Sequence, residues 1–100
     1  MVYLICYDIV CDRRRTRVAR VLESYGLRVQ KSVFEAVLQP HEYQKLHQKL
    51  QSLLVREATP QEYLECDQLR FYPISEHSRT RMSILGVQPN FAIDDEVLIV

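Results

Sequence analysis

The sequence lacks the features that identify membrane, secreted and metal-cluster proteins. No apolar run in its 100 residues approaches the roughly 20 residues needed to cross a bilayer. Its beginning has no charged segment before an apolar stretch, so we expect no signal peptide. The three cysteines have no CxxC spacing, and an odd number suits a reducing compartment. We therefore expect a cytoplasmic protein without a membrane partner, a zinc site or a disulfide framework.

The chain also lacks an excess of charge of either sign, with 13 basic and 13 acidic residues. Neutrality ordinarily disfavours nucleic-acid binding, because phosphate contacts favour basic domains. The charges are nevertheless unevenly distributed. Residues 13–31 contain seven basic side chains and one acid, Glu23, whereas three acids gather at residues 94–96. This distribution is compatible with one basic face on a neutral protein.

The order of apolar patterns predicts a single domain over residues 1–100, with a core at 1–74 and a tail at 75–100. The predicted elements are a strand at 2–9, a helix at 13–25, a bent pair of strands within 27–38, a helix from about residue 40, a strand at 68–74 and a terminal strand at 97–100. The order βαββαβ is that of an α+β, ferredoxin-like fold, here with an extra C-terminal strand.

Three residues indicate where the helices begin and end. Asp12 is expected to be the N-cap of the first helix, and Gly26 is expected to end it in the left-handed conformation. Pro40 is typical of the first turn of a helix and indicates where the second helix begins.

The strand at residues 2–9 is apolar on both faces, which has a consequence for assembly. Two helices can cover only one face of a four-stranded sheet. The other face would be an exposed apolar patch, and such patches usually mark interfaces. We therefore expect a homodimer whose two sheets pack face to face about a two-fold axis.

Asp8, at the end of this strand, has two interpretations. It could cap the first helix or pair with an arginine of its first turn, since an acid beside apolar residues needs compensation. Alternatively, it could bind magnesium, which takes oxygen ligands and often needs only one or two protein carboxylates. A two-fold axis would then bring two Asp8 carboxylates together.

The basic side chains also have two interpretations. They could form a solvated helix face, or they could bind phosphate, whose oxygens match the planar fork of arginine. The candidates for nucleic-acid binding are Arg13, Arg14, Arg15, Arg17 and Arg28. Because adjacent positions on a helix point in different directions, some of them must be structural. Tyr7 and Phe34 are candidates for a cleft, but aromatic residues within strands are more often core.

Several short motifs together resemble the second CRISPR-associated core protein family. They are Tyr7-Asp8-Ile9, the segment Arg15-x-Arg17-Val18, Gly26-x-Arg28-Val29-Gln30, Ser32-Val33-Phe34-Glu35 and Arg70-Phe71-Tyr72-Pro73. The resemblance covers residues 1–74 well and the terminal strand loosely. Lys31 departs from it, since the family commonly has an aromatic residue there.

The resemblance implies a ferredoxin-like homodimer whose C-terminal strand packs on the partner's sheet. It also implies an endonuclease of the spacer-acquisition stage that cleaves RNA or double-stranded DNA, with Asp8 at a magnesium ion, or manganese in its place. The alternative it leaves open is a noncatalytic adaptor that bridges integrase subunits and holds the captured duplex. A small-molecule sensor would fit the topology but would explain neither Asp8 nor the arginines.

Overall fold

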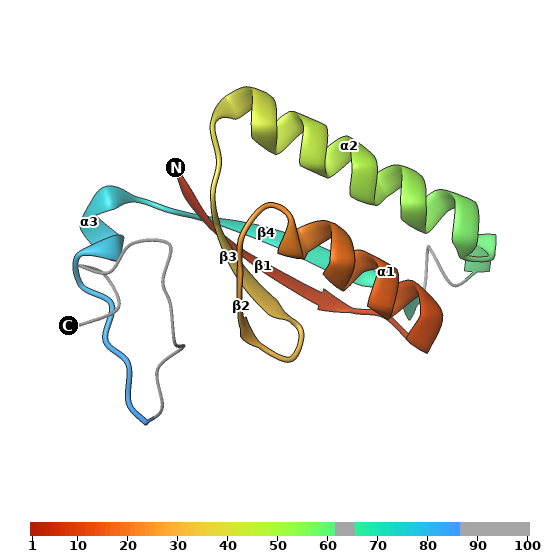
Figure 1. Cartoon of the computed structure of the whole chain (residues 1–100), viewed down its shortest axis with the longest axis horizontal. Helices are drawn as coiled ribbons and strands as arrows, with labels where there is room; N and C mark the ends of the chain where they lie inside the picture. The colour runs from red at the N-terminus through yellow and green to blue at the C-terminus, as the bar shows by residue number, and fades with distance from the viewer. Residues whose placement is uncertain (62–65, 87–100) are drawn as a thin grey trace.

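The structure, a computed structural model, describes residues 1–61 and 66–86. Its elements are β1 (Val2–Asp8), α1 (Asp12–Glu23), β2 (Leu27–Gln30), β3 (Val33–Val37), α2 (Pro40–Glu57), β4 (Gln68–Ile74) and the short α3 (Glu76–Arg79). The strands form one antiparallel sheet in the order β2-β3-β1-β4 (Figure 1). The predicted βαββαβ order is confirmed. The predicted strand at 97–100 lies outside the described residues.

Both helices α1 and α2 lie on the same side of this sheet, and the core lies between them and the strands (Figure 1). Alternation along the strands turns every second side chain toward the helices. The sheet contributes mainly Ile5, Tyr7, Phe34 and Ala36; α1 contributes Val18 and Leu22; α2 contributes Leu46, Leu50 and Leu54. These helix positions recur every three or four residues, which places them on one face of each helix.

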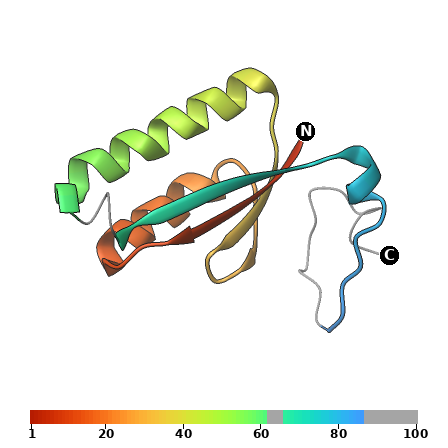
Figure 2. The same ribbon diagram turned by 180° about the vertical axis from the view of Figure 1, so that it is seen from behind.

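The opposite face of the sheet carries the alternate side chains, which point away from the helices. On β1 these residues are Val2, Leu4, Cys6 and Asp8. Figure 2 shows β1 and β4 from this side, with α1 behind them and α2 above. Val37 and Tyr72, which pair with β1 residues of this face, are 43% and 44% exposed. We call this surface the open face. Within residues 1–61 and 66–86, no helix combines the length and apolar character that a membrane span requires.

The expected ends of the first helix were both wrong in detail. Helix α1 begins at Asp12 itself, and Cys11 is the N-cap, whose carbonyl accepts the first intrahelical bond from the Arg15 N–H at 3.0 Å. Asp12 instead lies in the first turn, where its negative charge interacts favourably with the helix dipole and stabilises the helix.

Gly26 does not have a positive φ, so its requirement is steric rather than conformational. A Cβ atom at Gly26 would lie 2.2 Å from the Glu35 carbonyl oxygen and 2.9 Å from the Ala36 Cβ. The chain leaving α1 therefore passes directly against β3, and only glycine fits there.

Candidate active site at the end of strand β1

Asp8 is the last residue of β1, and its side chain is exposed on the open face. Its Cα pairs with Gln68, the first residue of β4. No hydrogen bond or ion pair joins the Asp8 carboxylate to any residue within 1–61 or 66–86. Among these residues, neither of the two structural roles considered for Asp8, a helix cap or an ion-pair partner, occurs. Both carboxylate oxygens are therefore available to a ligand.

An acid from elsewhere in the chain, Asp67, pairs with Arg14 in the first turn of α1. Its Oδ2 accepts a hydrogen bond from Arg14 Nε at 2.9 Å, and its Oδ1 accepts from Arg14 Nη2 at 3.4 Å. The Asp67 side chain is fully buried and that of Arg14 is 5% exposed. Asp67 Oδ1 also accepts from the Val10 N–H at 3.2 Å. Sequence reasoning missed Asp67; the available signal was an acid directly before a strand that pairs with β1.

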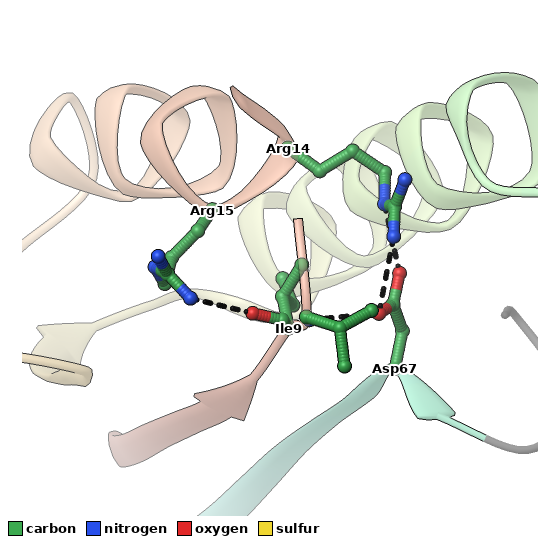
Figure 3. A network of polar contacts seen from close by, with 5 residues as sticks. Ile9, Arg14, Arg15 and Asp67 are labelled. Carbon is green, nitrogen blue, oxygen red and sulfur yellow. Dashed lines mark hydrogen bonds and ion pairs between the residues drawn. The ribbon is translucent and has the colours of Figure 1, made fainter. Parts of the chain in front are cut away.

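Arg15 contacts the same stretch of backbone from the other side. Its Nη1 donates to the Ile9 carbonyl oxygen at 2.8 Å, and its Nη2 forms an ion pair with Asp12 (Figure 3). Figure 3 shows Arg14 and Arg15 leaving α1 in different directions, one toward Asp67 and the other toward Ile9. In this conformation both side chains have internal partners, although both were candidates for binding phosphate.

Arg28 also has internal contacts. Its guanidinium donates to the Lys31 carbonyl oxygen from Nε at 3.1 Å and from Nη2 at 2.8 Å, which closes the turn between β2 and β3. Nη2 also donates to the Tyr7 hydroxyl at 3.3 Å, and the guanidinium carbon lies 5.4 Å from the centre of the Phe34 ring. Tyr7 is 5% exposed and Phe34 is fully buried, so both aromatic candidates pack in the core.

The remaining two basic candidates, Arg13 and Arg17, lie on the outer side of α1. Arg13 is exposed and Arg17 is partly so, and Arg20, which was not a candidate, is exposed on the same side. Residues seven apart on a helix lie nearly above one another, and position 17 falls between them on the same side. Arg13, Arg17 and Arg20 therefore form a basic stripe that begins one short connection away from Asp8.

Glu35 is the second acid on the open face. It lies in the middle of β3, opposite Leu4 of β1 and Leu27 of β2, and is 9% exposed. Burial among these neighbours raises the pKa of the Glu35 carboxyl above its ordinary value, because desolvation disfavours the charged form. Over the described parts of the chain, no three histidine, cysteine or acidic side chains meet in a way that could hold a metal ion. A metal site within one protomer would thus rest on the single carboxylate of Asp8.

A lone exposed acid at a strand end occurs in many kinds of protein. The family model for CRISPR associated protein Cas2 matches residues 1–82. The chain belongs to this family. The resemblance inferred from the motifs around Asp8, Gly26 and Phe34 is thereby confirmed.

The chain is similar to Cas2 proteins along most or all of its length. It is 42% identical over 87 residues to "CRISPR-associated endoribonuclease Cas2 3" of Synechocystis, covering 87% of this chain and 86% of that protein. It is 39% identical over 100 residues to "CRISPR-associated endoribonuclease Cas2 1" of Chloroflexus aurantiacus, covering 100% of both. Among solved structures, a chain of a "Partial Cas6-RT-Cas1--Cas2 complex" superposes with a TM-score of 0.71 at 32% identity, covering 84% of this chain and 89% of that one.

Proposed function

We propose that this protein is a metal-dependent endonuclease of the CRISPR spacer-acquisition stage, with Asp8 as the metal ligand. One observation carries the proposal: in a Cas2-family chain, the exposed Asp8 carboxylate at the end of β1 has no partner among the described residues. An acid with an internal partner would be explained by folding alone. Two relatives named as endoribonucleases support the cleavage of phosphodiester bonds.

The Asp8 carboxylate fits the needs of magnesium. Magnesium prefers oxygen ligands, keeps several waters and is commonly held by one or two carboxylates. An exposed carboxylate leaves room for those waters, which a buried acid such as Asp67 does not. Bound magnesium, or manganese in its place, supplies charge neutralisation and an activated water for attack on a phosphodiester.

We propose that the protein acts as a homodimer joined through the open face. The support is the apolar surface formed by Val2, Leu4, Val37 and Tyr72, which neither α1 nor α2 covers. Asp8 belongs to the same face of β1, so a two-fold axis through this surface would bring two Asp8 carboxylates toward one substrate. Each protomer supplies one carboxylate, so a site shared by the two protomers would contain two.

The basic stripe on α1 is the part of the surface best suited to hold the substrate's phosphates. Arg13, Arg17 and Arg20 share one side of the helix, and arginine binds phosphate oxygens with two parallel hydrogen bonds. Arg14, buried against Asp67, is instead assigned to the fold. The stripe adds affinity for the backbone of RNA or DNA without selecting a sequence.

A second candidate function is that of an adaptor that holds DNA without cutting it. The structural likeness to a chain of a complex that contains Cas1 favours this role, since it indicates a subunit built to assemble with an integrase. The adaptor role needs the open face and the basic stripe, but it does not need Asp8.

A cleavage assay distinguishes the two functions. Purified protein is incubated with labelled RNA and with double-stranded DNA, in magnesium and in excess chelator, beside an Asp8→Asn variant. The nuclease proposal requires cleavage by the wild type in magnesium, and loss of cleavage in chelator and in the variant. Equal cleavage by Asp8→Asn would refute it. Duplex binding without cleavage by either protein would favour the adaptor.

A further inference from the structure

We infer that Asp67 is a positioning residue for Asp8: together with Arg15, it fixes the Ile9–Val10 peptide, the second peptide unit after Asp8, and so restricts the directions in which the Asp8 carboxylate is presented. This inference rests on the proposed function, because it concerns the binding of magnesium by Asp8. It assigns a role to a residue that sequence reasoning passed over.

The key geometric fact is that two side chains hold one peptide unit. The carbonyl oxygen of Ile9 and the N–H of Val10 belong to the same planar group. Arg15 donates to this carbonyl at 2.8 Å, and Asp67 accepts from this N–H at 3.2 Å. The plane of the Ile9–Val10 peptide is therefore held by one hydrogen bond at its carbonyl and one at its N–H. Figure 3 shows Arg15 and Asp67 on opposite sides of this peptide.

Side chains are needed here because the sheet ends one residue earlier. The pairing of β1 with β4 stops at Asp8 and Gln68, and α1 begins at Asp12. The peptide between Ile9 and Val10 thus lies outside both regular elements. Val10 is 57% exposed, so water would otherwise compete for its N–H. Asp67 is the residue before β4. Its side chain accepts the Val10 N–H and so adds one hydrogen bond beyond the end of the β1–β4 pairing.

Arg14 keeps the Asp67 carboxylate in place for this task. The guanidinium contacts both carboxylate oxygens, and both side chains are almost completely buried. A two-point contact between buried side chains adds geometric specificity and so favours this orientation of the Asp67 carboxylate. The Ile9 side chain is also buried, at 1% exposure. Asp8 therefore lies between its pairing with Gln68 and the Ile9–Val10 peptide, one residue further along the chain, which the two side chains hold.

This arrangement matters for magnesium because no residue within 1–61 or 66–86 orients the Asp8 carboxylate through a hydrogen bond or ion pair. Groups that orient a metal ligand typically change metal affinity or activity by about 10- to 100-fold when removed. Asp67 acts through the backbone rather than on the carboxylate itself, so we expect the lower end of that range. The chain thereby combines an exposed metal ligand, Asp8, with a backbone that is held in place beside it.

The decisive experiment follows magnesium binding by NMR on ¹⁵N-labelled protein without nucleic acid. The main variant is Arg14→Met with Asp67→Leu, which replaces both charges of the Arg14–Asp67 pair with apolar groups of similar size, so that neither of the two is left buried without the other. It removes the acceptor of the Val10 N–H. The matched control is Glu76→Leu with Arg79→Met, which removes the ion pair on α3 and leaves the Asp8 region intact.

We expect the Val10 amide of the main variant to exchange with deuterium about tenfold faster, because one hydrogen bond is lost. We also expect the magnesium concentration that half-saturates the shifts of the Asp8 and Ile9 amides to rise about tenfold. The control should match the wild type in both. If the main variant does not fold, Arg15→Gln removes the hydrogen bond to the Ile9 carbonyl from a partly exposed position. The same rise in the half-saturating magnesium concentration is then expected, while the Val10 N–H keeps its Asp67 acceptor.

The outcomes separate this inference from the proposed function. If wild-type protein and Asp8→Asn respond to magnesium identically, the metal site itself is refuted and the positioning role falls with it. Suppose instead that the wild type binds magnesium through Asp8, and that the folded variant (Arg14→Met with Asp67→Leu, or Arg15→Gln) binds it equally well. The positioning role alone is then refuted. A merely structural role would lower the melting temperature without moving the magnesium titration, and this too would overturn the inference.

Discussion

Replacing Gly26 with alanine should destabilise the protein strongly through a single methyl group. The added Cβ would lie 2.2 Å from the Glu35 carbonyl oxygen, whereas ordinary contacts of a Cβ begin near 3.4 Å. The backbone of β3 would have to move by about 1 Å to restore normal contact. That strand cannot yield easily, because it pairs with β1 on one side and with β2 on the other.

The expected magnitude follows from the known costs of overpacking. Forcing extra atoms into a packed site costs about 1–3 kcal/mol, and a clash with backbone belongs at the upper end. Alanine regains about 0.4–1 kcal/mol by restricting the unfolded chain. The net loss should be about 2 kcal/mol, or roughly 8–16 °C in melting temperature for a domain of this size.

The assay is thermal and urea unfolding of both proteins at one protein concentration, since dimerisation would otherwise shift the midpoint. Gly86→Ala is the matched control: it has a φ of 92° but no atom within 4 Å of the added methyl group. It should cost only about 1 kcal/mol, from the left-handed backbone alone. If Gly26→Ala were no less stable than Gly86→Ala, the close approach of β3 would be refuted.

Four further perturbations test other parts of the structure. Arg14→Ala should cost about 3–5 kcal/mol in urea unfolding, because it leaves the Asp67 carboxylate buried without its partner; a loss below 1 kcal/mol would contradict the buried pair. Asp8→Asn should leave the melting temperature unchanged, since no described residue forms a hydrogen bond or ion pair with the Asp8 carboxylate; a sharp drop would restore a structural role. Leu4→Lys, on the open face, should shift light scattering across a dilution series toward the monomer, and an unchanged dimer would exclude this face as the interface. The raised pKa of Glu35 means that the folded state binds its proton more tightly than the unfolded chain does. This contribution to stability is complete below the ordinary glutamate value of 4.5 and is lost as pH rises through the raised pKa, so Glu35→Gln should remove that decline from the pH profile of the free energy of unfolding.

The sequence by itself determined the elements and their faces. Strand β1 and the apolar stripes of α1 and α2 are encoded in periods of two and of three to four residues, which any short segment displays without its neighbours. The same alternation placed Asp8 on the side of β1 opposite Ile5 and Tyr7. These features depend on local spacing, so they could be predicted before the elements were assembled.

Only the tertiary structure decided which charged groups meet. Arg14 and Asp67 lie 53 residues apart, and their pairing depends on the register of β4 against β1, which sets Asp67 beside the end of the first strand. The role of Gly26 likewise depends on how closely β3 passes, rather than on a local turn. Neighbouring arginines of similar sequence context differ in function for the same reason: the direction in which each leaves α1 decides whether it meets a buried acid, a backbone carbonyl or solvent.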